Sequence, residues 1–227
     1  MFYQRLSLKN EKFLEIDKLT PSLGIYMKPF KQADNYNKIA SHWASKSFNR
    51  DNGIDQHKRA LQLVENKERA IDIGCGSSGR IIEVLLNDGF VVEGMDFSIE
   101  MLNLAQQNHP NVKFYHADIC IWDFPAKYDF ISAWDSVWHA PLEEQANILK
   151  KLCNALAPKG VLIYTSGAVD EPGDGSNEFL GQMLYHAAVG VPAILNIINE
   201  CHCICRHLEN DDWPNRHLYL IIQRKSI

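Results

Sequence analysis

The 227-residue sequence lacks several features that mark particular classes of protein. No uninterrupted apolar run approaches the roughly 18 residues that predict a membrane-spanning helix. The opening stretch MFYQRLSLKNEKFLEIDKL has no apolar core of signal-peptide length. There is also no basic excess, because 23 Lys and Arg stand against 28 Asp and Glu, a formal net charge of −5. We therefore expect a cytoplasmic protein with no membrane association, and the charge argues against a nucleic-acid partner.

The sequence also lacks a cysteine framework. Its six cysteines, at positions 75, 120, 153, 201, 203 and 205, lie in or beside apolar segments without the regular spacing of small disulfide-rich proteins. Three of them alternate within CHCICRH (201–207), as side chains on one face of a strand do. Structural zinc sites use C-x₂₋₄-C spacing instead. The segment therefore predicts a half-buried strand, and no metal site is expected.

From residue 69 onward, short apolar runs alternate with helical patterns. Strands are expected at 69–73, 90–96, 112–118, 128–134 and 161–166, and helices at 79–89, 98–109 and 141–157. This alternation predicts βαβ units, a parallel sheet and right-handed crossovers. Ligand sites in such sheets lie beyond the carboxyl ends of the strands.

The last third of the chain has a different pattern. Residues 167–178 are rich in glycine and acidic residues, and we expect a mobile loop there. The sequence predicts helices at 179–187 and 191–200 and two final strands at 202–209 and 217–223. Residues 1–34 lack a strong period and are expected to form an N-terminal extension to one domain over 35–227.

The stretch IDIGCGSSGR, residues 71–80, has glycines in the spacing GxGxxG between an expected strand and an expected helix. Such a turn places glycine backbone and a helix N-terminus against a ligand. Asp96 ends the next strand, 22 residues after Gly74, where a carboxylate can accept hydrogen bonds from ribose hydroxyls. These features fit a nucleoside cofactor of either the dinucleotide or the sulfonium type.

Asp72 distinguishes the two types. A carboxylate at this strand end repels the phosphates of a dinucleotide, whereas it attracts an ammonium or a sulfonium. A charge pair about 4 Å apart is worth a few kcal/mol before desolvation, even when partly solvated. The sign of this interaction favours the sulfonium nucleoside.

Five segments carry a resemblance to a known family: AIDIGCGSSGR, VEGMDFSIEML, FYHADI, YDFISAWDSVWHA and LAPKGVLIYTS. In order and spacing they resemble the motifs of class I S-adenosylmethionine-dependent methyltransferases. The resemblance covers roughly residues 36–223, since YNKIASHWAS resembles the helix that often precedes the family's core. The chain departs from the family's commoner GxGxG loop, because Ser78 intervenes before Gly79. Gly79 is therefore expected to pack its helix rather than contact a cofactor.

The resemblance implies an α/β, Rossmann-like fold: a seven-stranded, mostly parallel sheet with helices on both faces and an antiparallel last strand. It implies S-adenosylmethionine as cofactor, bound by four groups of residues. These are Asp72, Gly74, Cys75 and Gly76 at the methionine end, Asp96 at the ribose, Phe97, Met101, Asp118 and Ile119 at the adenine, and Trp134 and Asp135 at the passage to the acceptor.

The acceptor side is less defined by the sequence. His139, Tyr185 and His186 are candidates for a catalytic base or an acceptor anchor, although each histidine also suits a surface or capping position. Trp43 and Trp138 suit either an apolar acceptor wall or the core.

Our hypothesis is an enzyme, a methyltransferase that transfers the methyl group to a small-molecule acceptor by in-line displacement and releases S-adenosylhomocysteine. An NAD-dependent oxidoreductase and a non-catalytic S-adenosylmethionine-binding module remain alternatives. We expect a monomer or a homodimer.

Overall fold

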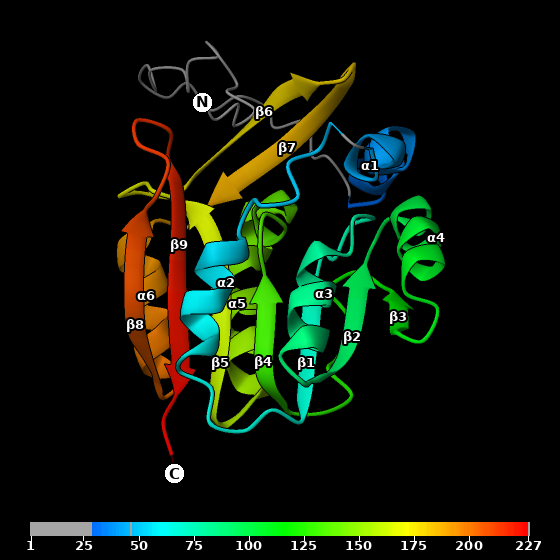
Figure 1. The fold of residues 1–227 in the computed structure, drawn as a ribbon. Helices are drawn as coiled ribbons and strands as arrows, with labels where there is room; N and C mark the ends of the chain where they lie inside the picture. Colours follow the sequence, from blue (N-terminus) through cyan, green and yellow to red (C-terminus); the bar gives the residue numbers. More distant parts are fainter. Residues whose placement is uncertain (1–28, 46, 227) are drawn as a thin grey trace, which may run out of the picture.

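Short apolar runs form the central sheet of the molecule. The computed structural model describes residues 29–45 and 47–226, and its main sheet has the strand order β3-β2-β1-β4-β5-β9-β8 (Figure 1). The strands are β1 (Arg69–Ile73), β2 (Val91–Asp96), β3 (Lys113–His116), β4 (Tyr128–Ala133), β5 (Leu156–Gly167), β8 (Cys203–Asn210) and β9 (His217–Arg224). The pairs among β1 to β5 are parallel, and β9 is antiparallel to both of its neighbours. The predicted fold class is confirmed, including the antiparallel last strand.

Helices cover both faces of this sheet. They are α1 (Pro29–Trp43), α2 (Ile54–Leu61), α3 (Arg80–Asn87), α4 (Ile99–Asn108), α5 (Leu142–Ala155) and α6 (Val191–Glu200), with a short 3₁₀ turn at Val137–His139. In Figure 1, α2 and α3 lie in front of the sheet, and α5 and α6 lie behind it.

Strand alternation divides the hydrophobic core between these two faces. On β4, Phe130 belongs to the cluster that includes Ile82 of α3, whereas the next residue, Ile131, belongs to the cluster that includes Leu149 of α5 and Ile198 of α6. All but one of these side chains are completely shielded from solvent, and Ile198 is nearly so. Burying each is worth about 1.5–3 kcal/mol, so the two clusters fix the helices to the sheet.

The segment after β5 corrects two predictions. Residues 173–179 form strand β6 (Gly173–Phe179) rather than a loop, and strand β7 (Gln182–Ala188) stands where a helix was expected at 179–187. The two strands form a separate antiparallel hairpin. Figure 1 shows this hairpin across the end of the main sheet, next to α1.

The helix prediction failed because the apolar residues here have helical spacing without a shared buried face. Phe179, Leu180, Met183 and Leu184 recur as they would on a helix, yet Leu180 is 54% exposed and Met183 47%. Leu180 and Gly181 adopt φ values of 51° and 75°. Two consecutive positive φ values give the turn twist that a two-residue hairpin requires.

Helix α1 crosses the expected domain boundary. It begins at Pro29, so the predicted division between residues 34 and 35 falls inside one helix. The predicted helix at YNKIASHWAS is confirmed as the C-terminal part of α1, and residues 1–28 lie outside the described residues. Nδ2 of Asn35 donates to the backbone oxygen of Met183 at 2.7 Å, which ties α1 to β7.

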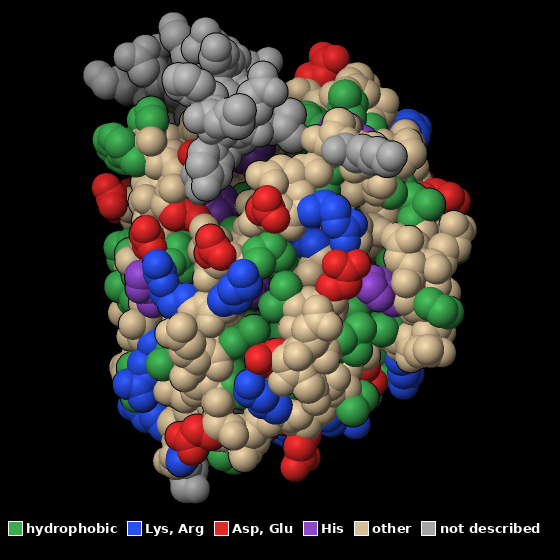
Figure 2. All heavy atoms as spheres, viewed as in Figure 1, with side chains coloured by type: hydrophobic (Ala, Val, Ile, Leu, Met, Phe, Trp, Pro, Cys, Tyr) green, Lys and Arg blue, Asp and Glu red, His purple; other side chains and the backbone are tan. Residues whose placement is uncertain are grey.

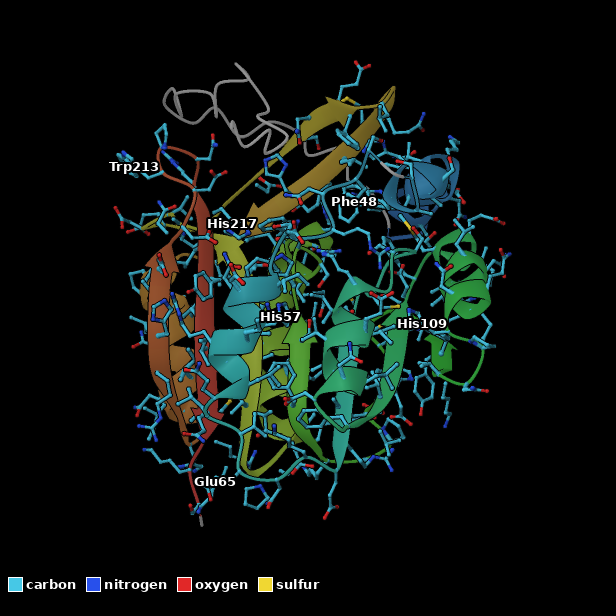
Figure 3. The ribbon with its side chains drawn as sticks, in the orientation of Figure 1. Phe48, His57, Glu65, His109, Trp213 and His217 are labelled. Atoms are coloured by element: carbon cyan, nitrogen blue, oxygen red, sulfur yellow. The ribbon has the colours of Figure 1, made fainter. Side chains whose placement is uncertain are left out.

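The segments that follow β1, β2 and β4 lie at one edge of the sheet. The parallel strands β1, β2 and β4 end there, and β9 begins there because it runs in the opposite direction. In Figure 3, His217 marks this end of β9, near the β6–β7 hairpin. Within residues 29–45 and 47–226, no helix has the length and hydropathy needed to cross a membrane.

Candidate functional site

A cavity of about 230 Å³ lies at the carboxyl ends of β1, β2 and β4. A single water needs roughly 10–15 Å³ by the same measure, so the space suits a ligand of many atoms. Ten of the eleven predicted cofactor residues line it: Gly74, Cys75, Gly76, Asp96, Phe97, Met101, Asp118, Ile119, Trp134 and Asp135. The structure therefore brings together segments that come from four separate strand ends.

Asp72 is the predicted residue that the cavity wall does not include. Its side chain is buried on β1, where it bonds with Ser132 and lies within electrostatic reach of Arg80. Burial raises the pKa of Asp72 to about 6. Its assignment to the methionine end stays a prediction, and this position favours an effect through charge rather than through direct contact.

The three glycines of the loop have three different roles. A Cβ on Gly74, at φ 69°, would stand 2.3 Å from Cβ of Ser136, so the loop passes too close to Ser136 for any side chain. A Cβ on Gly76, at φ 59°, would meet no atom of the described residues within 4 Å, and Gly76 lines the cavity. A Cβ on Gly79 would stand 2.2 Å from Nε2 of His109, which confirms the prediction that Gly79 is a packing residue.

Asp96 joins the glycine loop to the end of β2. Its Oδ2 accepts the backbone N–H of Gly76 at 2.9 Å, and its Oδ1 accepts that of Ser98 at 2.9 Å. Burial raises the pKa of Asp96 to about 6, although these two hydrogen bonds oppose the rise. A carboxylate has about four acceptor positions, so two remain for hydroxyl groups of a ligand in the cavity.

The wall also contains buried polar atoms without partners. Nε1 of Trp43 and Oγ of Ser136 make no hydrogen bond with any residue that the structure describes, and both residues line the cavity. Buried polar groups in native proteins are nearly always paired, and an unpaired one costs about 1–3 kcal/mol. The wall therefore fits a ligand that carries both hydrogen-bond donors and acceptors, as S-adenosylmethionine does.

At the acceptor side, His139 is held in one tautomer. Its Nδ1 lies 2.7 Å from the backbone oxygen of Tyr185, which only accepts, so Nδ1 carries the proton. Its Nε2 then accepts, as the indole N–H of Trp138 at 2.9 Å also requires. Burial lowers the pKa of His139 to about 4, so the ring is neutral at pH 7.

The tautomer of His139 fixes the hydroxyl group of Tyr36. Oη of Tyr36 lies 2.6 Å from Nε2 of His139, and because this nitrogen carries no proton the phenol is the donor, sharing the lone pair of Nε2 with the indole N–H of Trp138. Tyr36 lines the cavity. Its hydroxyl proton is used in the hydrogen bond to His139, and its oxygen can still accept a hydrogen bond from a ligand. Burial raises the pKa of Tyr36, and the charges of Asp96 and Asp135 raise it further. The phenol therefore stays protonated. Sequence analysis missed Tyr36, because its partner is 103 residues away.

The other two acceptor-side candidates lie on β7, outside the cavity wall. Tyr185 orients His139 through its backbone oxygen, and its hydroxyl group accepts the backbone N–H of Leu142 at 3.2 Å. The ring of His186 stands over Gly175 of β6. Catalytic roles for Tyr185 and His186 stay predictions, and neither side chain reaches the wall in this structure.

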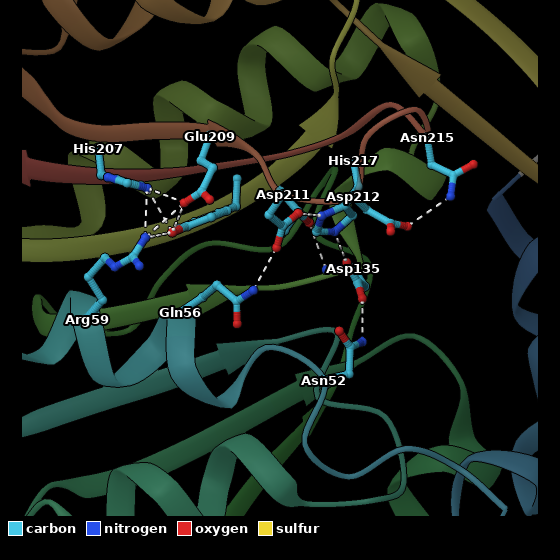
Figure 4. Close-up of polar contacts among 12 residues, drawn as sticks. Asn52, Gln56, Arg59, Asp135, His207, Glu209, Asp211, Asp212, Asn215 and His217 are labelled. Atoms are coloured by element: carbon cyan, nitrogen blue, oxygen red, sulfur yellow. Dashed lines mark hydrogen bonds and ion pairs between the residues drawn. The ribbon is translucent and has the colours of Figure 1, made fainter. Parts of the chain in front are cut away.

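A chain of polar side chains runs outward from Asp135 (Figure 4). Oδ2 of Asp135 accepts Nδ2 of Asn52 at 3.0 Å, and its Oδ1 accepts Nε2 of His217 at 3.0 Å. The other ring nitrogen of His217 bonds to Asp211, which accepts Nε2 of Gln56 at 2.6 Å. Burial alone would lower the pKa of His217, but the two carboxylates raise it to about 10. Burial would likewise raise the pKa of Asp135, but His217, Arg80 and Asn52 lower it.

Arg80 is a wall residue that the sequence analysis missed. Its Nε donates to the backbone oxygen of Asn52 at 2.9 Å, its Nη1 donates to Oγ of Ser78 at 3.3 Å, and its guanidinium lies 5.0 Å from the ring centre of Phe48. A cation in the first turn of α3 opposes the helix dipole. That unfavourable placement was the available signal in the sequence that Arg80 has another role.

Residues 70–160 match a family model described as a methyltransferase domain. The phosphoethanolamine N-methyltransferase of Plasmodium falciparum is 26% identical over 133 residues, which are 56% of this chain and 50% of that protein. The trans-aconitate 2-methyltransferase of Rhizobium leguminosarum is 35% identical over 97 residues, 41% of this chain and 36% of that protein. The chain thus spans half the length of these curated relatives or less.

Solved structures share the fold over more of the chain. An S-adenosylmethionine-bound amino pentose methyltransferase of Micromonospora echinaspora has a TM-score of 0.62 at 17% identity, covering 83% of this chain and 96% of that one. A sugar N-methyltransferase of Streptoalloteichus has a TM-score of 0.64 at 14% identity, covering 92% and 100%. Residues 70–160 therefore match a methyltransferase domain, and the chain shares the fold of S-adenosylmethionine-dependent methyltransferases over most of its length.

Proposed function

We propose that this chain is an enzyme that binds S-adenosylmethionine in the cavity and transfers its methyl group to a small-molecule acceptor. One observation carries the proposal: the glycine loop, Asp96 and the residues after β3 and β4 line a single cavity. The methyltransferase-domain match covers the same residues, 70–160. The matched relatives, by their names, methylate small molecules.

The wall offers a place for each part of the cofactor. Asp96 would accept the ribose hydroxyls, and Phe97 and Met101 would flank the adenine, with Asp118 and Ile119 at its edge. The loop from Gly74 to Gly76 would hold the methionine end beside the unpaired hydroxyl of Ser136. When bound, S-adenosylmethionine supplies an electrophilic methyl group on a sulfonium.

The chain's own contribution is alignment and exclusion of water. Tyr36 on α1, Trp138 after β4 and Asp135 line the same cavity as the glycine loop, and we assign them to the acceptor side. Aligning two reactants in this way is worth about 7–11 kcal/mol of the barrier. His139 also lines the cavity, and it is neutral, held by the backbone oxygen of Tyr185, and sets the direction of the Tyr36 hydroxyl.

The charged side chains and the cysteines support our expectations about the protein's partners and location. Acidic and basic side chains are interspersed on the face shown in Figure 2, which favours a small molecule over a polyanion. All six cysteines are free thiols, which supports a cytoplasmic location. A monomer or homodimer remains our expectation.

The test is acceptor-dependent production of S-adenosylhomocysteine. The full chain is incubated with S-adenosylmethionine and pooled metabolites, and product is quantified by mass spectrometry. We expect at least one pool to raise the product well above the acceptor-free rate, and Gly76→Ala to abolish the increase. A chain that binds the cofactor but leaves it intact with every pool would be a binding module, and the enzymatic proposal would be wrong.

A further inference from the structure

Asp135 is held in an unusual backbone conformation at the end of β4. Its φ of 52° is in the left-handed region, which aspartate and asparagine tolerate better than most residues but still adopt at a cost. Its backbone N–H donates to Oγ1 of Thr165 at 2.8 Å, which holds the conformation. This conformation places the side chain in the wall of the cavity.

The carboxylate of Asp135 is built to stay ionised. Two donors from other elements hold it, Nδ2 of Asn52 and Nε2 of His217, each at 3.0 Å. His217 stays cationic because Asp211 binds its other ring nitrogen. The side chain of Asp135 is 28% exposed and that of His217 is 18% exposed, so solvent screens this arrangement only partly. Of about four acceptor positions on the carboxylate, two remain for a ligand.

Charge in the wall is predominantly negative. Three carboxylates line the cavity, those of Asp96, Asp118 and Asp135, against the single guanidinium of Arg80. Arg80 is directed to the backbone oxygen of Asn52 and to Ser78, and it is the one Lys or Arg of the described residues in this wall. An anionic acceptor would have to be held against this net charge.

The hydrogen-bonding groups beside Asp135 also disfavour an anionic acceptor, because they accept hydrogen bonds. Tyr36 lines the same cavity as Asp96 and Asp135, and the charges of both carboxylates raise its pKa. Its proton is committed to Nε2 of His139, so its oxygen accepts. The free positions of Asp135 and Tyr36 are therefore both acceptors, and they match a group with two N–H donors better than a hydroxyl with one.

We propose that the acceptor is an amine, and that Asp135 and Tyr36 hold its nitrogen by accepting two N–H hydrogen bonds. This inference rests on the proposed methyl transfer. The neutral amine nitrogen uses its lone pair to form the C–N bond, the C–S bond breaks with its electrons passing to sulfur, and the nitrogen becomes positively charged. Asp135 stabilises that developing charge, as pre-oriented groups do in transition states. No base is required in the transfer step, which agrees with a neutral His139 that is a poor base.

The experiment compares acceptors that differ only in their reactive group. Three matched sets are offered to the full chain with methyl-¹³C-labelled S-adenosylmethionine: ethanolamine, ethylene glycol and glycolate; cyclohexylamine, cyclohexanol and cyclohexanecarboxylate; phenethylamine, 2-phenylethanol and phenylacetate. The ¹³C shift of the product separates N-methyl from O-methyl groups. Binding is measured in parallel as the unfolding temperature of the S-adenosylhomocysteine complex with each compound added.

We expect N-methylated product or added stabilisation from the amine of at least one set and none from its alcohol or acid. Asp135→Asn should lower kcat/KM for that amine at least 100-fold, while S-adenosylhomocysteine affinity changes less than threefold. Asparagine tolerates the same φ, so the variant tests the charge. The exposed Asp123→Asn is the matched control and should behave as wild type.

Three results would overturn the inference. One is O-methylated product, or stabilisation by alcohols or acids alone, which would leave the proposed methyl transfer intact. Another is an Asp135→Asn variant that is folded and fully active on the amine. The third is S-adenosylhomocysteine binding with neither product nor stabilisation from any amine. Failure to bind S-adenosylhomocysteine at all would instead contradict the proposed function.

Discussion

Oδ2 of Asp96 accepts the backbone N–H of Gly76 at 2.9 Å, so the last residue of β2 holds the glycine loop that follows β1. Neighbouring parallel strands place these two segments side by side, since Asp96 follows Met95, the β-partner of Ile73. The cofactor site is thus assembled from the sheet register itself. Disturbing either residue should affect ligand binding before it affects the fold.

Binding of S-adenosylhomocysteine should weaken in acid. Burial raises the pKa of Asp96 to about 6, and protonation removes an acceptor that the ribose hydroxyls need. The dissociation constant should therefore rise below pH 6, by up to about tenfold per pH unit for one proton. Calorimetric titration between pH 5 and 8 measures this, and Asp96→Asn should bind more weakly at pH 8 with a flatter pH profile. An affinity constant over this range would contradict the role of Asp96.

Alanine at the two loop glycines should have different effects. Gly76→Ala places a methyl group in open cavity space, so the variant should fold, lose about 1–2 kcal/mol to its positive φ, and lose ligand affinity. Gly74→Ala has the same backbone cost plus a 2.3 Å clash with Ser136, so its loss of stability should be larger. Urea unfolding and ligand titration of both variants check this. Normal affinity in Gly76→Ala would show that the ligand lies elsewhere.

Removing the hydroxyl group of Tyr36 should slow turnover without loosening cofactor binding. Tyr36→Phe removes the hydroxyl group that His139 orients, and with it a hydrogen-bond acceptor in the cavity. We expect kcat/KM to fall about 10–100-fold. S-adenosylhomocysteine affinity should change less than threefold. Tyr115→Phe is a matched control, because that hydroxyl group bonds to Glu93 outside the cavity wall. Equal losses in the two variants would indicate a general packing effect.

His217 should make stability fall as pH rises. Its pKa is about 10 in the fold against 6.5 for the free side chain, so its contribution is complete below pH 6.5 and is lost as pH approaches 10. The slope from this one proton is at most about 1.4 kcal/mol per pH unit. Denaturant unfolding from pH 6.5 to 8.5 should show a steeper loss in wild type than in His217→Asn, which should also be less stable at pH 6.5. Parallel curves would mean that His217 is not held as a cation.

Local patterns in the sequence were enough to predict much of the fold and of the cofactor side. The run from β1 through α3 combines an apolar strand, a glycine turn and an amphipathic helix, so its structure follows from neighbours in the chain. The βαβ alternation then places Asp96, Asp118 and Asp135 at one edge of the sheet. All three aspartates line the cavity.

The acceptor side depends on contacts between distant segments. Tyr36 meets His139 across 103 residues, and His217 meets Asp135 across 82, without a local motif at either end. The β6–β7 hairpin turns at Leu180, which has a positive φ although leucine gives no turn signal. Sequence reasoning therefore selected Tyr185 and His186 from a presumed helix, and it missed the tyrosine that lines the cavity.

The most direct test of the central claim is thermal unfolding with S-adenosylmethionine, S-adenosylhomocysteine and NADH in parallel, on wild type and on Asp96→Asn. A ligand at 100 times its dissociation constant stabilises by about 2.7 kcal/mol, and each kcal/mol shifts the midpoint roughly 2–4 °C in a chain of this size. We predict a rise of several degrees with the two sulfur nucleosides, much reduced in the variant, and none with NADH. A rise with NADH alone would contradict the account.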